Sequence, residues 1–307
     1  MGGIGYSIFV ASGLISLGVY SLVVAINSFL QASPASNNGD SRHTWKANAI
    51  SVVQSSPESS GGRGFWWNIK QRAAIYLVVL WLVIAILHDL VSAADSDPLF
   101  KGHTPVHRFT LLRSSAVLLL FLVLSLSLIF VPSLDYRLFF SILSASFFLQ
   151  SSSFPTTDIQ GHLISVSSRV CALSSFLSLA LAVNPKLFAF EVGLWASLVL
   201  QGFWSLQTGL SLYVDYFTPE GCHRLLDVPP GVDGSTKCDL EDSLLRAIAI
   251  IDFLLVLYVL LVLLIVTSLY GILSKLSSSP RARVASYDSL PPSDCNVQMK
   301  TLAGTQA

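Results

Sequence analysis

Long apolar runs, bounded by charged residues, proline or glycine, dominate the pattern of this chain. A transmembrane α-helix needs about 20 consecutive, mainly apolar residues to cross the hydrocarbon core. Seven runs approach or exceed this length, and they predict an all-α, polytopic transmembrane helix bundle. They cover residues 4–30, 73–93, 109–131, 134–154, 162–183, 187–214 and 246–273.

The number of crossings depends on two of these runs. The last run, 246–273, is almost purely aliphatic, whereas 134–154 and 162–183 are diluted by serine, and the latter contains Arg169. Six crossings are therefore the alternative to seven. Serine lets helix backbones approach closely in lipid, so we expect these serines to serve in helix packing.

The N-terminal run has two interpretations. It lacks a basic segment before it and is longer than the apolar core of a usual signal peptide, which favours a transmembrane helix. The alternative is cleavage after Leu30-Gln31-Ala32.

Two segments lack the apolar residues that a packed core requires. Residues 31–64 are crowded with Ser, Asn, Gly and Pro, and the tail from 277 to 307 is similarly polar. Such composition is typical of disorder. The chain thus divides into a transmembrane domain, residues 1–276, and a disordered tail, residues 277–307.

Composition agrees with a lipid environment. Hydrophobic residues make up 52% of the 307 residues and charged residues only 12%, whereas about a quarter of the residues in soluble domains are charged. The bilayer is therefore the expected partner. The formal net charge is zero, so no basic field favours nucleic acid.

The basic residues predict the orientation. With seven crossings, the 31–72 loop, the turns at Arg137 and Lys186 and the tail share one side, which holds 11 of the 18 Lys and Arg residues; the other side holds seven. Because basic residues accumulate in cytoplasmic loops, we expect a cytoplasmic C-terminus and a non-cytoplasmic N-terminus. The membrane is an endomembrane or the plasma membrane.

Polar residues inside the apolar runs form a candidate polar layer near the non-cytoplasmic side. Ionisable residues within a bilayer are costly and often functional. In the sixth run, the i, i+3, i+6 spacing of Gln201, Trp204 and Gln207 lets all three face the bundle interior. The full set is His88, Asp89, Arg169, Gln201, Trp204, Gln207 and Asp252.

A metal site is one interpretation of this side of the membrane, because five of the six histidines lie there. Imidazole and carboxylate groups are common ligands of divalent metals, and His107, His162 and Asp252 are the candidate ligands. The alternative is structural: Arg169 and Asp252 form an interhelical ion pair, and the histidines lie in interfacial water.

The cysteines have no metal-binding spacing. Cys222 and Cys238 share the 215–245 loop on the predicted non-cytoplasmic side, where oxidation is permitted. They form a disulfide or remain two free thiols.

The tail carries two short motifs. Tyr287-Asp288-Ser289-Leu290 has the Tyr-x-x-Leu pattern of trafficking-adaptor ligands, and Ser286 follows Arg281 and Arg283 as in a basophilic kinase site. A trafficking adaptor is thus one candidate partner, and a second copy of the chain is another. The sequence identifies no cofactor. GxSxG, GxxxxGK[ST], HExxH and GxGxxG patterns are missing, which leaves an enzymatic role open but without a motif.

Several motifs in the later part of the chain carry a family resemblance. They are Leu200-Gln201-Gly202-Phe203-Trp204, Gln207-Thr208-Gly209, Cys222 to Leu226, Lys237-Cys238-Asp239-Leu240-Glu241 and Leu245-Arg246-Ala247. With these motifs, roughly the last two thirds of the chain resembles the plant branch of the transmembrane protein forty-five family. Asp158 to His162 and His107 resemble the two helix-start histidines of that family.

This resemblance implies a polytopic membrane domain of unknown function, loosely called a viral-response protein in plants. The N-terminal MGGIGY lacks the family's Gly-His and Pro-Gly element, so no role for a histidine carries over there.

Three functional hypotheses follow. The first is a non-enzymatic membrane protein that acts through partners or transports a small solute. The second is a metal-dependent membrane enzyme or metal carrier that uses His107, His162 and Asp252. The third is a scaffold whose polar loop and tail recruit partners.

Overall fold

The computed structural model describes most of the apolar runs as helices. The described residues are 2–32, 62–94, 106–131, 134–152, 159–217, 222–224, 236–238 and 241–277. Most of the 31–64 loop and the tail, for which the sequence predicts disorder, lie outside these ranges.

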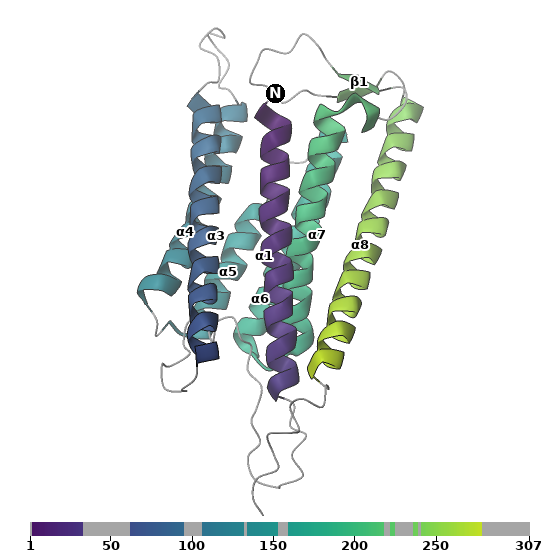
Figure 1. Ribbon diagram of the computed structural model, residues 1–307. Helices are drawn as coiled ribbons and strands as arrows, with labels where there is room; N and C mark the ends of the chain where they lie inside the picture. The colour runs from purple at the N-terminus through teal and green to yellow at the C-terminus, as the bar shows by residue number, and fades with distance from the viewer. Residues whose placement is uncertain are drawn as a thin grey trace, which may run out of the picture.

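Within the described ranges, seven α-helices form one bundle, which confirms the all-α polytopic class (Figure 1). Successive helices run in opposite directions, so the start of α1 and the end of α8 lie at opposite ends of the bundle. The helices are α1 (Gly2–Ala32), α3 (Gly62–Ala94), α4 (Val106–Phe130), α5 (Tyr136–Ser151), α6 (Ile159–Val183), α7 (Phe188–Tyr213) and α8 (Glu241–Ser277).

Six of these helices are long and apolar enough to cross a membrane, so the chain is a multi-pass integral membrane protein. The exception is α5, whose 16 residues span about 24 Å, less than the roughly 30 Å hydrocarbon core. The predicted run 134–154 is therefore longer than the helix that it forms.

Both ends of α5 are held by side chains. Asp135 precedes the helix and accepts a hydrogen bond from the Arg137 backbone N–H at 3.3 Å. At the other end, the Arg113 guanidinium of α4 donates to the Leu149 carbonyl at 2.9 Å and to Ser152 Oγ at 3.3 Å. A cation at a helix C-terminus satisfies carbonyls that lack an intrahelical donor, so Arg113 compensates for the early end of α5.

Small residues set the closest helix contacts, as the sequence predicts for its serines. Ser144 of α5 and Ser175 of α6 are buried and donate to each other's backbone carbonyls, both at 2.9 Å. Between α1 and α7, a Cβ added at Gly202 would lie 3.0 Å from the Ile15 backbone nitrogen and 3.1 Å from the Ala11 carbonyl oxygen. These helices approach so closely because no larger side chain separates them.

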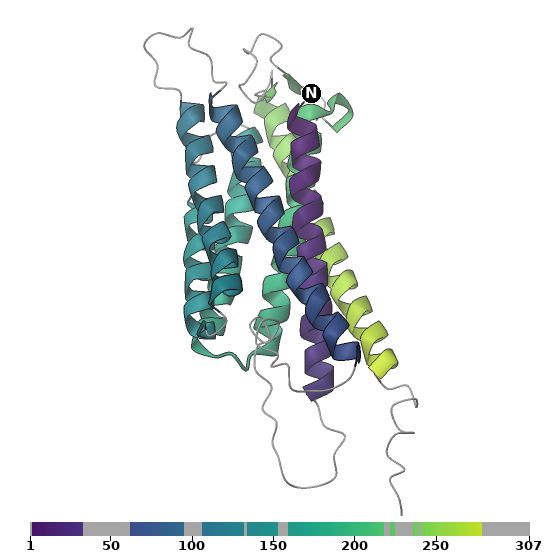
Figure 2. The ribbon, with the colours of Figure 1, turned by 60° about the vertical axis from the view of Figure 1, so that its left-hand side comes forward.

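Helix α7 lies at the centre of the bundle. It contributes to three separate buried clusters. Leu194 packs in a cluster with α4, α5 and α6, and Trp204 packs in one with α6 and α8. Val199 packs in the third, with α1, α6 and α8. Helix α8 lies at the edge and exposes many Leu and Val side chains. Figure 2 shows that α3 is inclined relative to α4.

A short hairpin joins α7 to α8. After the 3₁₀ turn Asp215–Phe217, the strands β1 (Cys222–Arg224) and β2 (Thr236–Cys238) pair antiparallel at the end of the bundle where α1 begins (Figure 1).

Candidate functional site

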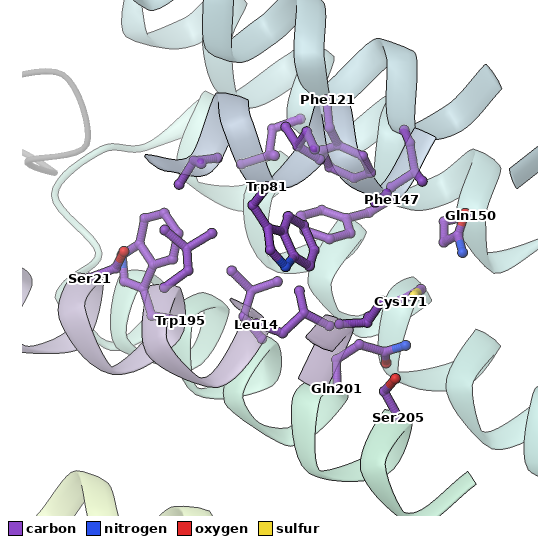
Figure 3. Close-up of a pocket in the computed structure, with 18 of the residues that line it drawn as sticks. Leu14, Ser21, Trp81, Phe121, Phe147, Gln150, Cys171, Trp195, Gln201 and Ser205 are labelled. Atoms are coloured by element: carbon purple, nitrogen blue, oxygen red, sulfur yellow. The ribbon is translucent and has the colours of Figure 1, made fainter. Parts of the chain in front are cut away.

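A cavity of about 600 Å³ lies within the bundle, lined by residues of α1, α3, α4, α5, α6 and α7 (Figure 3). Its wall is mainly apolar, with Trp81, Phe121 and Phe147 in the middle of the close-up. Glu191 is the single carboxyl among the described residues that line it, and none of these residues is a lysine, arginine or histidine.

The cavity is elongated along α7. Its wall includes Glu191 near the start of that helix and Thr208 near the end. At about 1.5 Å per residue, these positions are roughly 25 Å apart along the helix axis. The cavity therefore extends through most of the thickness of a hydrocarbon core.

Two predicted polar residues shape the cavity wall. The Gln201 side-chain amide donates to Ser167 Oγ at 2.6 Å, and its Oε1 is buried without a hydrogen-bond partner. The Trp204 indole N–H donates to the Leu163 carbonyl at 3.0 Å, and the side chain is 1% exposed. Both residues therefore join α7 to α6, and Gln201 Oε1 remains a hydrogen-bond acceptor without a donor at the cavity wall.

Gln207 does not line the cavity but joins α7 to α8. Its Oε1 accepts from the Tyr258 hydroxyl at 2.9 Å, and its Nε2 donates to Ser211 Oγ at 3.1 Å. The amide is thus satisfied on both atoms, as buried amides in lipid require.

His88 and Asp89 form a separate cluster with Tyr6 of α1. The Tyr6 hydroxyl donates to Asp89 Oδ1 at 2.9 Å, and the Tyr6 ring stacks on the His88 imidazole with centroids 3.7 Å apart. His88 Nδ1 lies 3.7 Å from the same carboxylate oxygen, and Asp89 is buried. This cluster fastens α1 to α3 beside the cavity, since Tyr6 also lines it.

His162 and Asp252 meet between α6 and α8. His162 Nε2 lies 2.9 Å from Asp252 Oδ1, with the histidine side chain 19% exposed and the aspartate 53% exposed. Asp252 therefore pairs with His162 and not with Arg169. The Arg169 side chain is exposed on α6.

The predicted metal site is only partly described. His107 is the second residue of α4, but its side chain lies outside the described residues, and α4 and α8 lie at opposite edges of the bundle (Figure 1). Among the described side chains, no group of three or more His, Cys, Asp or Glu is close enough to hold a metal ion.

The predicted polar layer is thus divided into separate groups. His88 and Asp89 join α3 to α1, Gln201 and Trp204 join α7 to α6, and Gln207 joins α7 to α8, while Asp252 of α8 contacts His162. No hydrogen bond or ion pair among the described residues connects one group to another.

Sequence reasoning missed Glu191, which is 1% exposed in the first turn of α7. A signal was present, because an ionisable residue inside an apolar run is the feature that singled out Asp252. Tyr6 and Tyr258 carried no such signal, since tyrosine is common at membrane interfaces.

The cysteine pair lies in the hairpin. The strand register places Cys222 directly opposite Cys238, while the side chains of both lie outside the described residues. Cys171 is a free, buried thiol on the cavity wall. The tail residues Ser286, Tyr287 and Leu290 lie outside the described residues.

Residues 132–271 match a family model. That family is described as a family of unknown function (DUF716). The match includes most of the length from α5 to α8, and with it Glu191, Gln201, Trp204 and the pair of His162 and Asp252. It leaves out α1, α3 and α4, which supply the other wall of the cavity and the cluster of Tyr6, His88 and Asp89.

The comparison with curated proteins gives no match. The family match supports the expectation of a domain of unknown function, and the described helices show a multi-pass membrane protein.

Proposed function

We propose that this protein is a non-enzymatic membrane protein that binds a small, mainly apolar solute. The solute would lie in the cavity that is lined by α1 and by the helices α3 to α7. The observation that carries the proposal is the cavity itself, about 600 Å³ with a mainly apolar wall. Sites for small molecules typically measure about 300–1,000 Å³ and combine apolar walls with a few polar groups.

The polar atoms at the wall favour an amphiphile over a pure hydrocarbon. Gln201 offers a buried, unpartnered acceptor, and Ser205 and Thr208 contribute hydroxyl-bearing side chains to the same part of α7. A buried polar atom without a partner is costly, so a ligand hydroxyl that donates to Gln201 Oε1 would relieve that cost.

Position within the membrane supports a role in holding or moving this solute. The cavity follows α7 for roughly 25 Å, so a bound molecule would lie at the depth of the lipid chains. A carrier for a small solute requires such a site near the middle of the bilayer.

Binding of a radiolabelled long-chain alcohol, dodecanol, to the full chain in phosphatidylcholine nanodiscs tests this proposal. We expect saturable binding above that of empty nanodiscs, and a loss of at least tenfold in affinity for Val10→Phe, which adds volume at the cavity wall. Val259→Phe is the matched control, because Val259 is exposed on α8 and does not line the cavity. Equal binding by both variants, or no saturable binding by the parent, would contradict the proposal.

A metal-dependent enzyme or metal carrier is the second candidate. The contact of 2.9 Å between His162 and Asp252 favours it, whereas the placement of α4 and α8 at opposite edges of the bundle weighs against His107 as the third ligand of the hypothesis. Catalytic zinc usually has three protein ligands. The test measures the metal content of the purified, untagged chain and of the His107→Ala, His162→Ala double variant. One equivalent of metal in the parent and none in the folded variant would support this candidate. Less than about a tenth of an equivalent in both proteins after zinc addition would reject it.

The finer assignments belong to the same proposal. Similarity to the plant branch of the transmembrane protein forty-five family is supported by the motifs around Gln201 and Cys238. A cytoplasmic C-terminus is supported by the basic residues on that side, and it would expose Tyr287 and Leu290 to trafficking adaptors.

A further inference from the structure

We infer that the cavity takes up single-chain amphiphiles with an anionic head group, and that Arg113 of α4 holds this head group beside the cavity while the apolar chain lies inside. This inference rests on the proposed binding function and names the class of ligand. Its evidence comes from the position of Arg113, from the hydrogen bonds that it makes, and from the neighbouring side chains that line the cavity.

Arg113 lies at one end of a membrane span. It is the third residue of Leu111–Phe130, the part of α4 that is long and apolar enough to cross a membrane. Helix α5 ends at the same level, because the guanidinium donates to the carbonyl of Leu149 and to Ser152 Oγ. Arginine side chains near the ends of transmembrane helices extend toward the lipid head groups. Arg113 is therefore at the depth where the charged group of an amphiphile would remain.

The guanidinium of Arg113 retains hydrogen-bond donors for a ligand. Both of its hydrogen bonds come from Nη2, whereas a guanidinium has five N–H groups on three nitrogens. Nε and Nη1 therefore have no hydrogen-bond partner among the described residues, and no described carboxylate forms an ion pair with this side chain. Hydrogen bonds from a guanidinium to a carboxylate or phosphate are about twice as strong as those between neutral groups. Arg113 can thus hold the end of α5 and bind an anion at the same time.

The neighbours of Arg113 connect it to the cavity. Ser114, the next residue of α4, lines the cavity, and so does Gln150 in the last turn of α5. Gln150 is also exposed, and Ile164 of α6, another residue of the wall, is 38% exposed. The cavity wall therefore reaches the outer surface of the bundle next to Arg113. We call this part of the wall, formed by Ser114, Gln150 and Ile164, the cavity mouth.

The cavity extends away from this mouth as a long, mainly apolar space. Figure 3 shows Gln150, Gln201 and Ser205 toward one end of the view and Trp195 and Ser21 toward the other. Along α7 the cavity measures roughly 25 Å. An extended acyl chain suits such a space, and its head group would stay at the mouth.

The charge of Arg113 decides which amphiphile binds best. Lipid chains are as apolar as the cavity wall, so an apolar chain gains little by leaving the bilayer for the protein. Selectivity must then come from the head group. The described residues that line the cavity include no basic side chain, so Arg113 beside the mouth supplies the positive charge that distinguishes an anionic amphiphile from a neutral one of equal length.

A purely structural role for Arg113 makes a different prediction. The hydrogen bond to the Leu149 carbonyl stabilises the end of α5 whether or not a ligand is bound. If Arg113 served α5 alone, its replacement would lower stability without changing the preference between an anionic and a neutral amphiphile.

The experiment compares dodecyl phosphate with dodecanol at neutral pH for the full chain in phosphatidylcholine nanodiscs, after subtraction of binding to empty nanodiscs. We expect the parent to bind the phosphate about tenfold more tightly than the alcohol. Arg113→Gln should abolish this preference and leave dodecanol binding unchanged. Arg137→Gln is the matched control, because it removes the same charge from an exposed position in the first turn of α5, and it should behave as the parent.

A second variant provides an independent test should Arg113→Gln fail to fold. Gln150→Glu changes the side chain little in size and adds a negative charge at the exposed mouth. We expect it to reduce the preference for dodecyl phosphate about threefold.

The outcomes separate the inference from the proposed function. Equal affinities of the parent for the two ligands, or a phosphate preference that persists in a folded Arg113→Gln, would overturn the inference while the proposed binding function stands. Displacement of dodecyl phosphate by an equal concentration of inorganic phosphate would indicate a site for the free anion and would also overturn it. Absence of saturable binding for both dodecyl ligands would overturn the inference and the proposed function together.

Discussion

At the scale of single residues, buried polar groups in this bundle are placed where another helix can satisfy them. Trp204 donates to the Leu163 carbonyl of α6, and the Gln207 amide bonds to Tyr258 of α8 and Ser211 of α7. Lipid offers no alternative donor or acceptor, so each such bond also fixes which helix faces meet.

Tyr258→Phe tests one of these bonds. The change removes the donor to Gln207 Oε1 and leaves a buried acceptor unsatisfied, so we expect the free energy of unfolding in mild detergent to fall by about 1 kcal/mol. Tyr270→Phe is the control, because the Tyr270 side chain is 41% exposed. A denaturant titration in which both variants lose the same free energy would show that the bond contributes nothing.

At the scale of elements, backbone proximity decides which helices pack. Gly202 brings α7 close to the backbone of α1 near Ile15 and Ala11, and Gly18 of α1 lies equally close to Val199 of α7. The interface of α1 and α7 therefore depends on glycine, whereas α5 and α6 are joined by the serine pair of Ser144 and Ser175.

Gly202→Leu should push α1 away from α7, since an added Cβ already lies 3.0 Å from a backbone atom that cannot rotate aside. Overpacking of this kind costs about 1–3 kcal/mol, which a thermal or denaturant melt of the purified protein would detect. Gly5→Leu is the matched control, because nothing lies within 4 Å of a Cβ at Gly5. Equal stability of the two variants would argue against close packing of α1 on α7.

The hairpin carries the disulfide prediction. Residues directly opposite in an antiparallel pair have Cα atoms about 4.5–5.5 Å apart, within the range that a disulfide spans. The register of Cys222 opposite Cys238 therefore supports a bridge. We expect reduction to add two free thiols per chain, and the Cys222→Ala, Cys238→Ala variant to lose about 3 kcal/mol of stability. An unchanged thiol count after reduction of the folded, oxidised protein would reject the bridge.

At the scale of the whole molecule, helix direction separates the start of the first described helix from the end of the last. The start of α1 and the end of α8 lie at opposite ends of the bundle (Figure 1), and α5, although short, returns the chain between α4 and α6. If all seven helices cross the membrane, the start of α1 and the end of α8 lie on opposite sides of it. If only six cross, these two helix ends lie on the same side.

Protease-cleavable tags on the two termini distinguish these topologies in sealed microsomes, whose outer face is the cytoplasmic one. We expect cleavage of the C-terminal tag without detergent and protection of the N-terminal tag until detergent is added. Both tags cleaved, or both protected, would favour six crossings over seven.

Sequence alone determined the helices, because each needs only a local run of apolar residues. The six spanning helices follow such runs closely, and even the ambiguous run 134–154 holds a helix, although Asp135 and the contact of Arg113 with Leu149 limit it to Tyr136–Ser151. The interior orientation of Trp204 and Gln207 also followed from their spacing, since both are buried.

Only the tertiary structure decided which polar residues meet. Asp252 pairs with His162 and not Arg169, the layer divides into separate groups, and Glu191 lies buried on the wall of a cavity that residues of six helices line. The order and rotation of helices around a bundle depend on contacts between residues far apart in the chain, here Gly202 with Ile15 and Tyr6 with Asp89. Local hydropathy does not predict those contacts, because each transmembrane helix makes its backbone hydrogen bonds within itself, whichever helix it packs against.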